Sequence, residues 1–435
     1  MIWNPVESIP RADMEALQLE RLRWSVARTY DRVAAFRAKM DAAGVRPEHI
    51  RTLADIRLLP LTTKEDLRSG YPFGLFASPV SEMVRFHASS GTTGKPVVAG
   101  YTRGDMEMWT DCCARVAGGA GLDQGDIAQV SFGYGMFTGG LGMHYGLERL
   151  GCTVIPASAG NTERQIMFMQ DFGVTAMIST PSYALHLAEI IEDNGIDLST
   201  FRLRTALFGG EGHTHAMKTE IERRLGILDT QNYGLTEICG PGVSFECLES
   251  HGHFMHINED HFYPEIIDPD TGEVLPEGAE GEMLLTTLTK EGIPMLRYRT
   301  KDITSLHRGP CACGRTTVRM DMVKGRSDDM MIIRGVNVFP SQIESVLMTV
   351  KGIGPHYLIV VTTEKALDRI EVQVEVIDGA LLDRYSELER LRDEIRHKLR
   401  VVLQIDARVT LLNPKTLERS TGKSKRVDDR RAKAF

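Results

Sequence analysis

The chain has 435 residues, of which 42% are hydrophobic and 25% are charged, so it is long enough for a large core and more than one domain. Its formal net charge of -8 argues against a nucleic-acid binder, although a small anionic ligand needs only local positive charge. The absence of a long apolar run and of a signal-peptide pattern predicts no membrane partner and a cytoplasmic location. Seven cysteines, an odd number, argue against a disulfide framework and leave metal binding open.

The first two thirds of the chain change from helical to alternating patterns. Apolar residues spaced three to four apart predict one amphipathic helix over 14–43, closed by Gly44. Thr62 and Glu65 then predict a capping box that opens another helix. From 127 to 210, β-like runs such as VTAMIS alternate with helix-like runs such as NTERQIMFMQDFG. This alternation predicts βαβ units around a mostly parallel sheet.

The last third divides in two near Ser327. Short runs between Gly- and Pro-rich turns over 264–325 predict antiparallel strands or a small barrel. The order beyond it is a helix, two strands, a helix and a strand, expected at 341–350, 356–363, 369–377, 382–401 and 407–413. We therefore predict an α/β protein with two domains. Residues 1–326 form a large N-terminal domain of mixed β-sheets flanked by helices with a small distorted β-barrel, and residues 327–435 form a small α+β domain.

The stretch HASSGTTGKPVVAGYT, residues 87–102, contains a loop rich in glycine and hydroxyl groups. It fails the nucleotide P-loop template, because Ser89 stands where the first glycine belongs and Pro96 follows Lys95 in place of a hydroxyl residue. Successive small residues nevertheless allow backbone amides to converge on an anion, with hydroxyl donors and a lysine added. The alternative is a solvated, flexible turn.

Four further motifs follow the loop in a fixed order: NYGLTEICGPG (232–242), LRYRTKDI (296–303), GRSDDMMIIRG (325–335) and RSTGKSKRV (419–427). In this order they are the signature of the acyl-adenylate-forming enzymes. The blocks FGYGMFTGGLGMHYGLERLG, GNTERQ, EDHFYPEIIDP and IRGVNVFPSQIE make the chain closely resemble the phenylacetate–coenzyme A ligase family within them. The resemblance runs from about Trp3 to the C-terminus, and five ordered motifs are far more specific than one.

The resemblance implies a two-step ligase reaction. ATP and Mg²⁺ activate an aryl carboxylic acid similar to phenylacetate as an acyl adenylate, and coenzyme A then accepts the acyl group, with AMP and pyrophosphate released. Positioned donors and cations, rather than a protein nucleophile, stabilise the charge that develops on the phosphate. Two alternatives are an adenylating enzyme with another acceptor, such as a deazaflavin, and a non-catalytic ATP-binding descendant. The joint presence of Lys423, Glu237 and Asp302 weighs against the second.

The resemblance also assigns the nucleotide contacts. The residues implied to bind the β- and γ-phosphates are Ser89, Ser90, Gly91, Thr92, Thr93, Gly94 and Lys95. Those implied along the adenine are Gly209, Gly210, Glu211, Asn232, Tyr233 and Gly234, with Tyr233 stacked on the ring and with Gly212 where the family usually has proline. Asp302 is expected to grip the ribose diol with help from Arg326. Each residue alone has an ordinary structural alternative, such as a turn or a helix start.

The catalytic residues are implied in the same way. Thr236 is expected to hydrogen-bond the α-phosphate and Glu237 to hold Mg²⁺, a cation that prefers oxygen ligands. Lys423 is expected to bridge the substrate carboxylate and the α-phosphate. The small domain of this superfamily is mobile and turns about a hinge, which corresponds here to Asp328. Rotation is expected to withdraw Lys423 before thioester formation.

Coenzyme A is expected to meet the small domain. The positions implied beside its pantetheine arm are Gly335, Val336 and Asn337. The basic residues of the tail, which either meet its phosphates or form a solvated surface, are Lys415, Arg419, Lys425, Arg426, Arg430 and Arg431. A homodimer is a family expectation only.

The aryl pocket is expected in the segment SFGYGMFTGGLG. Tyr134 and Phe137 are candidates for its lining, and Gly139 and Gly140 are expected to leave room for a ring. The alternative is that these aromatic and glycine residues only pack the core.

A separate cluster predicts a structural zinc site. Cys311 and Cys313, with a glycine after them, resemble a zinc knuckle, and Cys247 lies in a segment rich in histidine. Some members of the family carry zinc at these positions, which makes His256 the expected fourth ligand and leaves His253 open. The alternative is a set of buried free thiols. The remaining cysteines, which are expected to pack the core, are Cys112, Cys113, Cys152 and Cys239.

Overall fold

The computed structural model describes residues 1–89, 96–334, 336–364, 367–419 and 424–431. The chain divides into two compact units. The large unit comprises residues 1–179, 199–210 and 228–323, and the small unit comprises residues 180–198, 211–227 and 324–435. The small unit therefore includes two segments from the middle of the chain, and the domain boundary before Ser327 stays a prediction.

Two helices occupy the region where the sequence predicts one. Helix α1 (Arg11–Arg32) and helix α2 (Ala34–Ala42) are separated at Val33, whose backbone is extended and whose side chain is buried. The break allows Leu22 of α1 and Phe36 of α2 to contact the same core. The prediction of one continuous helix over 14–43 is therefore wrong.

The predicted capping box lies one residue later than expected. Helix α3 (Lys64–Ser69) begins after Thr63, and the carboxylate of Asp66 accepts hydrogen bonds from the amide and the hydroxyl of Thr63. Thr62 donates its hydroxyl to the carbonyl of Leu296 instead, at 2.6 Å. Because Thr62 is used for this tertiary contact, Thr63 and Asp66, rather than Thr62 and Glu65, cap the helix.

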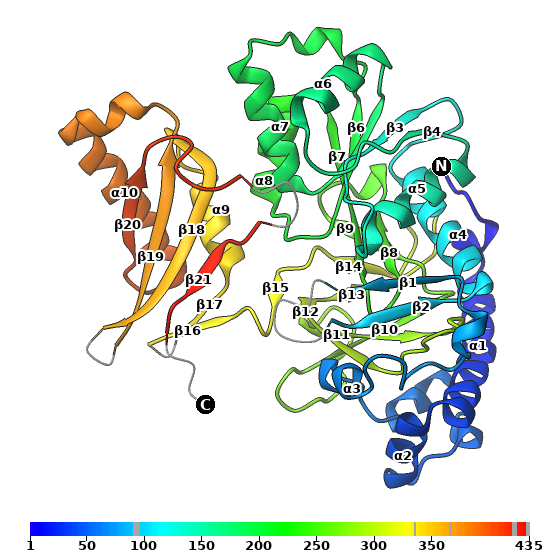
Figure 1. Ribbon diagram of the computed structural model, residues 1–435. Coiled ribbons are helices and arrows are strands. Elements are labelled where there is room, and N and C mark those ends of the chain that lie inside the picture. Colours follow the sequence, from blue (N-terminus) through cyan, green and yellow to red (C-terminus); the bar gives the residue numbers. More distant parts are fainter. Residues whose placement is uncertain (90–95, 335, 365–366, 420–423, 432–435) are drawn as a thin grey trace. The chain divides into compact units, whose positions relative to one another are not determined.

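The main sheet of the large unit has nine strands among the described residues, in the order β13-β14-β9-β8-β7-β6-β5-β3-β4 (Figure 1). The mutually parallel strands are β3 (Ile127–Val130), β4 (Thr153–Ile155), β5 (Ala176–Ser179), β6 (Thr205–Phe208) and β7 (Leu228–Leu235). The antiparallel continuation is β8 (Gly240–Glu246), β9 (Phe254–Ile257), β14 (Arg319–Asp321) and β13 (Leu306–His307). Helices α5 (Thr138–Leu150) and α6 (Thr162–Asp171) alternate with the parallel strands along the chain, as predicted.

Smaller elements complete the large unit. Strands β10 (Phe262–Ile267), β11 (Gly281–Thr287) and β12 (Tyr298–Thr304) pair antiparallel, as the turn-rich sequence predicts. Strands β1 (Arg85–Ala88) and β2 (Val98–Tyr101) form a separate antiparallel pair. Helix α4 (Arg103–Gly119) follows β2, and most of its residues are buried.

The small unit has a four-stranded sheet in the order β20-β19-β18-β21 (Figure 1). Its strands and helices are α7 (Pro181–Asp193), α8 (His215–Leu225), β15 (Gly325–Arg326), β16 (Met331–Ile333), β17 (Val336–Val338), α9 (Pro340–Leu347), β18 (Ile353–Glu364), β19 (Leu367–Val376), α10 (Tyr385–Leu403), β20 (Arg408–Leu412) and β21 (Val427–Asp429). Leu391, Ile395, Leu399 and Leu403 repeat every fourth residue and bury one face of α10.

The predicted α/β class, with a large N-terminal and a small C-terminal domain, is confirmed. Within the described ranges, no helix combines the length and the apolar character that crossing a bilayer requires.

Candidate active site

The ends of β6 and β7 bring two of the predicted nucleotide segments together. The side-chain amide nitrogen Nδ2 of Asn232 donates to the carbonyl of Phe208 at 3.0 Å. A Cβ atom on Gly209 would lie 2.8 Å from the backbone oxygen of Asn232, so only glycine fits this approach. Gly210 has a φ of 87°, which also favours glycine. The sequence order alone gives no sign of this contact, which fixes the two segments side by side.

Tyr233 and Asp302 meet although 69 residues separate them. The phenol of Tyr233 donates to Oδ2 of Asp302 at 2.5 Å, and Asp302 is buried on β12. The hydroxyl of Thr300 accepts the amide of Asp302 at 3.1 Å. Two motifs that the resemblance assigns to adenine and ribose are therefore joined directly.

Thr236 and Glu237 lie in the turn between β7 and β8. Close packing shapes this turn, because a Cβ atom on Gly234 would come 1.7 Å from the carbonyl oxygen of Gly240. Glu237 is 9% exposed, and Nζ of Lys64 lies 3.9 Å from its Oε1. The turn thus holds the Glu237 carboxylate at the edge of solvent, beside the Lys64 cation. Carboxylate oxygens are suitable ligands for a hard metal ion.

A buried lysine that the sequence analysis missed lies near this turn. Nζ of Lys290 donates to the carbonyl of Ile238 at 2.5 Å and lies 5.0 Å from the centre of the Tyr101 ring. Burial lowers the pKa of Lys290, although the charges of Asp105 and Glu237 oppose this shift. A lone lysine after a threonine-rich strand carries no pattern that distinguishes it from a surface lysine.

The hydroxyl-rich loop connects β1 to β2. Ala88 pairs with Val98, and Oγ of Ser89 accepts the amide of Val97 at 3.0 Å. Ser90, Gly91, Thr92, Thr93, Gly94 and Lys95 lie outside the described residues, as do Gly335 and Lys423. The phosphate contacts of the loop therefore stay predictions.

His87 links this loop to the predicted aryl segment. Its Nδ1 lies 3.1 Å from the carbonyl oxygen of Met136, and the amide of Ala88 donates to the same carbonyl at 3.0 Å. The imidazole packs edge-on against Tyr101 and Trp109. Burial lowers the pKa of His87, so it is a neutral connector between the two segments. Sequence reasoning missed it, because a single histidine before a loop has no distinguishing pattern.

The aryl candidates cluster at the start of α5. The phenol of Tyr134 lies 3.1 Å from Nδ1 of His144, and burial raises its pKa. Phe137 packs against Phe132, with ring centres 5.7 Å apart. A Cβ atom on Gly139 would lie 2.3 Å from the ring of Phe137. The space beside Gly139 therefore accommodates the phenyl ring of Phe137.

Gly140 is constrained by backbone rather than by a side chain. Its Cβ position would lie 2.9 Å from the carbonyl oxygen of Gly133. Its predicted role in leaving room for a substrate ring stays a prediction.

In the small unit, Arg326 and Asp328 form a bidentate ion pair. Nε of Arg326 lies 2.8 Å from Oδ1 of Asp328, and the second nitrogen lies 3.0 Å from Oδ2. Asn337 is exposed on β17, opposite Ile332. The ribose, hinge and pantetheine roles of these residues stay predictions. The pair shows that the guanidinium has a carboxylate partner in this state.

Much of the basic tail is neutralised by carboxylates. Lys415 pairs with Asp193 at 2.6 Å, Arg430 with Asp428 at 2.7 Å, and Arg431 with Asp368 at 2.8 Å. Arg426 stacks on the ring of Tyr357 at 4.5 Å. These contacts occupy cations that the sequence offers for coenzyme A phosphates, and their coenzyme A role stays a prediction.

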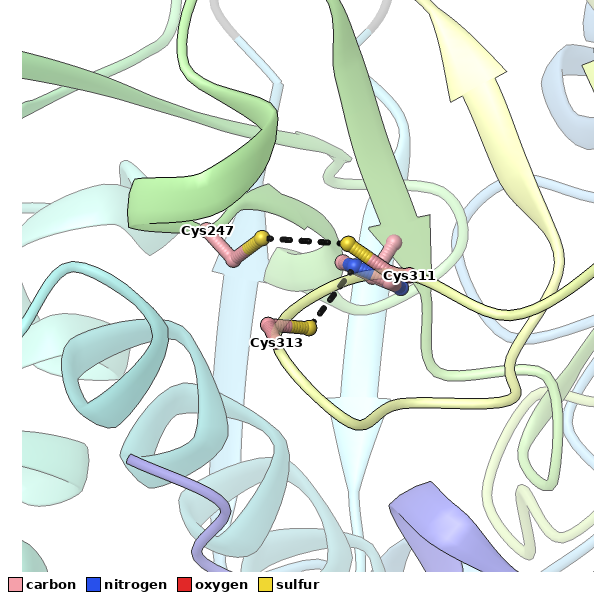
Figure 2. A group of neighbouring side chains, drawn as sticks. Cys247, Cys311 and Cys313 are labelled. Atoms are coloured by element: carbon pink, nitrogen blue, oxygen red, sulfur yellow. Dashed lines mark hydrogen bonds between the residues drawn. The ribbon is translucent and has the colours of Figure 1, made fainter.

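The predicted metal ligands assemble. One ligand atom each from Cys247, His256, Cys311 and Cys313 lies within 4.8 Å of the others. The sulfurs of Cys247 and Cys311 are 3.8 Å apart, and the sulfur of Cys313 lies 3.4 Å from Nε2 of His256 (Figure 2). Because His253 is exposed and outside this group, the structure selects His256.

The surroundings favour a thiolate at Cys313 and a fixed imidazole at His256. The thiol of Cys247 and the ring of His256 hold the pKa of Cys313 far below its usual value, although burial opposes this shift. A guanidinium nitrogen of Arg315 lies 3.6 Å from the same sulfur. Nδ1 of His256 is 2.9 Å from the hydroxyl of Thr317, which leaves Nε2 directed at the cluster.

The four remaining cysteines are buried free thiols, as expected. Burial raises the pKa of each of them, namely Cys112, Cys113, Cys152 and Cys239. They are therefore unreactive packing residues.

Comparisons with known proteins agree with this geometry. Residues 82–288 match the model of the AMP-binding enzyme family, and residues 335–431 match that of the AMP-binding enzyme C-terminal domain. The phenylacetate-coenzyme A ligase of Aromatoleum evansii is 47% identical over 99% of this chain and 97% of its own length. Those of Escherichia coli and Thermus thermophilus are also 47% identical, over 97% and 100% of their lengths.

Solved structures extend the likeness to the fold. A 2-hydroxyisobutyryl-CoA ligase in the postadenylation state, in complex with 2-HIB-AMP, has a TM-score of 0.91 and 29% identity, covering 98% of this chain and 91% of that one. The same ligase in its thioesterification state has a TM-score of 0.72. The chain belongs to the phenylacetate–coenzyme A ligase family of AMP-binding enzymes.

Proposed function

We propose that the protein activates phenylacetate, or a closely similar arylacetate, with ATP and transfers the acyl group to coenzyme A. The observation that carries this proposal is the 47% identity to phenylacetate-coenzyme A ligases along nearly the whole chain. Adenylation replaces a poor leaving group with AMP and removes the charge that repels a thiol. Coenzyme A then attacks the acyl carbon, and the products are the acyl thioester, AMP and pyrophosphate.

The first half-reaction, formation of the acyl adenylate, depends on side chains that are positioned around ATP. Asp302 binds the ribose diol, and its orientation is supported by the hydrogen bond from Tyr233. Glu237, with its carboxylate at the edge of solvent, would hold Mg²⁺, and the ion would offset phosphate charge there. Thr236 donates to the α-phosphate, and Lys423 approaches the substrate carboxylate and the same phosphate.

The acid is bound beside α5. Tyr134 and Phe137 line the acid pocket. The contact between His87, which precedes the hydroxyl-rich loop, and Met136, in the aryl segment, supports this location for the pocket. Pocket volume separates similar acids only weakly, because one methylene changes discrimination by about 1–3 kcal/mol. Phenylacetate and its ring-substituted relatives are therefore the class to test.

Pyrophosphate release measured across a panel of acids, with and without coenzyme A, tests the proposal. The expected result is release that requires an arylacetate, together with acyl-CoA formation when coenzyme A is present. Release that ignores every aryl acid, or acyl transfer that ignores coenzyme A, would overturn it and favour another acceptor.

We further infer that the Cys247 cluster binds a structural zinc ion. A zinc–sulfur bond of about 2.3 Å in a tetrahedron places two sulfur ligands about 3.8 Å apart. The Cys247 and Cys311 sulfurs have this separation, 3.8 Å. Three thiols and one imidazole complete a tetrahedron and leave no position for substrate, so zinc here would stabilise the loop that begins at Cys311.

The remaining assignments stay predictions from the sequence and the family. They are a cytoplasmic location and a homodimer, and sedimentation of the purified protein measures the second directly.

A further inference from the structure

Lys290 is a fully buried lysine of the large unit. Its Nζ donates to the carbonyl of Ile238 at 2.5 Å and lies 5.0 Å from the centre of the Tyr101 ring. Among the residues that the structure describes, no carboxylate lies within ion-pair distance of this nitrogen. Burial of an ammonium group without a carboxylate partner opposes folding, and one carbonyl and one aromatic face offset only part of that cost. Stability alone therefore does not explain a lysine at this position.

Lys290 contacts a turn whose backbone is hydrogen-bonded on every available group. The amides of Ile238 and Cys239 both donate to the carbonyl of Leu235, at 3.1 and 3.0 Å. The carbonyls of the same two residues accept side-chain donors, because Lys290 donates to the first and the phenol of Tyr101 donates to the second at 2.9 Å. The peptide groups at this end of the turn are thus fixed through both their amides and their carbonyls.

A third buried donor holds the start of the next strand. Nε1 of Trp109 donates to the carbonyl of Pro241 at 2.8 Å, so side chains from three different segments fix the stretch 238–241. Thr236 and Glu237 directly precede this stretch. Glu237 shares a planar peptide unit with the first residue of the stretch, so a shift of that residue moves the backbone that carries its carboxylate.

We propose that Lys290 is a positioning residue for nucleotide binding, because its hydrogen bond to Ile238 fixes the turn that carries Thr236 and Glu237. This inference rests on the proposed function, in which Glu237 holds Mg²⁺ beside the phosphates of ATP. A residue that costs stability and is aimed at the backbone of a binding turn is typical of a functional site, where stability is exchanged for a fixed geometry.

Lys290→Met tests the proposal, since it removes the donor and keeps most of the apolar side chain. The probe is the ATP analogue with a methylene group between the α- and β-phosphates, which cannot be cleaved at the bond that adenylation breaks. Calorimetric titration with Mg²⁺ present should give a dissociation constant roughly tenfold higher than that of the parent protein. With EDTA in place of Mg²⁺, the constants of the two proteins should agree within about twofold.

Thermal unfolding separates positioning from a purely structural role. Lys290→Met eliminates the burial cost of the ammonium group, and this gain offsets the hydrogen bond that Ile238 loses. The unfolding temperature should therefore fall by no more than about 4 °C. A structural role predicts the opposite pattern, in which the unfolding temperature falls and the binding of the analogue is unchanged.

Two further variants complete the comparison. Tyr101→Phe removes the neighbouring donor to Cys239 and should also weaken the Mg²⁺-dependent binding. Lys398→Met is the matched control, because Nζ of Lys398 also lies near a backbone carbonyl, that of Thr349 at 3.4 Å, but on α10 of the small unit. It should leave both dissociation constants unchanged.

Three results with Lys290→Met would overturn the proposal: unchanged binding with Mg²⁺, equal weakening with and without Mg²⁺, and a loss of stability larger than expected or a failure to fold. Unchanged Mg²⁺-dependent binding in Tyr101→Phe would also contradict it, because the turn would then tolerate the loss of a fixed carbonyl.

Glu237→Gln tests the function on which the proposal rests, and it should abolish the strengthening of analogue binding by Mg²⁺. If Glu237→Gln loses this effect and Lys290→Met keeps it, only the positioning role fails. If Glu237→Gln keeps the effect, the metal role of Glu237 fails, and the positioning proposal fails with it.

Discussion

The phenol of Tyr233 donates to the carboxylate of Asp302 and thereby joins β7 of the main sheet to β12 of the smaller antiparallel sheet. Asp302 is buried, and the 2.5 Å hydrogen bond from Tyr233 helps to fix the orientation of its carboxylate. The ribose contact proposed for Asp302 would depend on such support.

Tyr233→Phe should therefore raise the KM for ATP. A hydrogen bond to a charged group contributes about 1.5–3 kcal/mol, so we expect a loss in kcat/KM for ATP of roughly tenfold or more. Initial rates of pyrophosphate release at varied ATP measure it. Tyr30→Phe is the control, since Tyr30 donates to Asp41 at 2.8 Å in an exposed position. Equal effects of the two variants would contradict a specific role.

Gly139→Ala should change the preference for the acid. The added methyl group would lie 2.3 Å from the ring of Phe137 and must displace it. We expect a higher KM for phenylacetate and an unchanged KM for ATP. Gly135→Ala is the control, because a Cβ atom there meets nothing within 4 Å. If Gly139→Ala left the preference among carboxylic acid substrates unchanged, Phe137 would not line the acid pocket.

Protein purified without added zinc should contain about one zinc ion per chain. Cys313→Ser and His256→Asn should lose the metal and unfold at a lower temperature, whereas His253→Asn should keep it, since His253 is exposed outside the cluster. Elemental analysis and thermal unfolding provide the measurements. Metal-free protein in which Cys311 and Cys313 react freely with a thiol reagent would refute the zinc site.

Stability should fall with acid because of His261. Its Nε2 lies 3.1 Å from Asp260 and its Nδ1 2.8 Å from Thr289. Burial lowers the pKa of His261 from 6.5 to about 4, although Asp260 opposes the shift. Between these values the unfolded chain binds the proton more readily than the folded protein. The free energy of unfolding should therefore decrease by about 3 kcal/mol as the pH falls through this range.

Urea denaturation at several pH values between about 4.5 and 7 measures this slope. His261→Asn removes this titrating group and should reduce the slope, while the contribution of buried His87 persists. His397→Asn, at an exposed position on α10, should leave the slope unchanged. An unchanged slope in His261→Asn would assign the acid sensitivity to other groups.

Periodicity predicted most of the fold. The alternation over 127–210 and the order of elements beyond 341 are both present, because each depends on which face of a helix or strand is buried. The break at Val33 was not predictable in this way, since residues on both sides keep an apolar spacing and only the shape of the core requires two directions. The shift from Thr62 to Thr63 has the same origin, because a tertiary contact with Leu296 outcompetes the local cap.

The site residues that belong to a sequence motif were predictable, whereas the isolated ones were not. The adenylation motifs lead to Tyr233 and Asp302, and the paired cysteines lead to the cluster of Cys247, His256, Cys311 and Cys313. Nothing local in the sequence distinguishes His87 or Lys290, because each makes its contacts with a segment far along the chain. Glu211 belongs to a predicted adenine segment, yet its carboxylate bridges Ser182 and Ser424, which no spacing indicates.

The loop that begins at Cys311 also has a consequence for folding. Arg315 donates to Glu7 at 2.5 Å and to the carbonyl of Met1 at 2.6 Å, across a separation of more than 300 residues, while Cys311 faces Cys247. The loop that begins at Cys311 therefore contacts the first residues of the chain through Arg315. Contacts between residues so far apart in the sequence form only after long segments are ordered. The contacts of Arg315 with Glu7 and Met1 should therefore form late, once most of the chain has been synthesised.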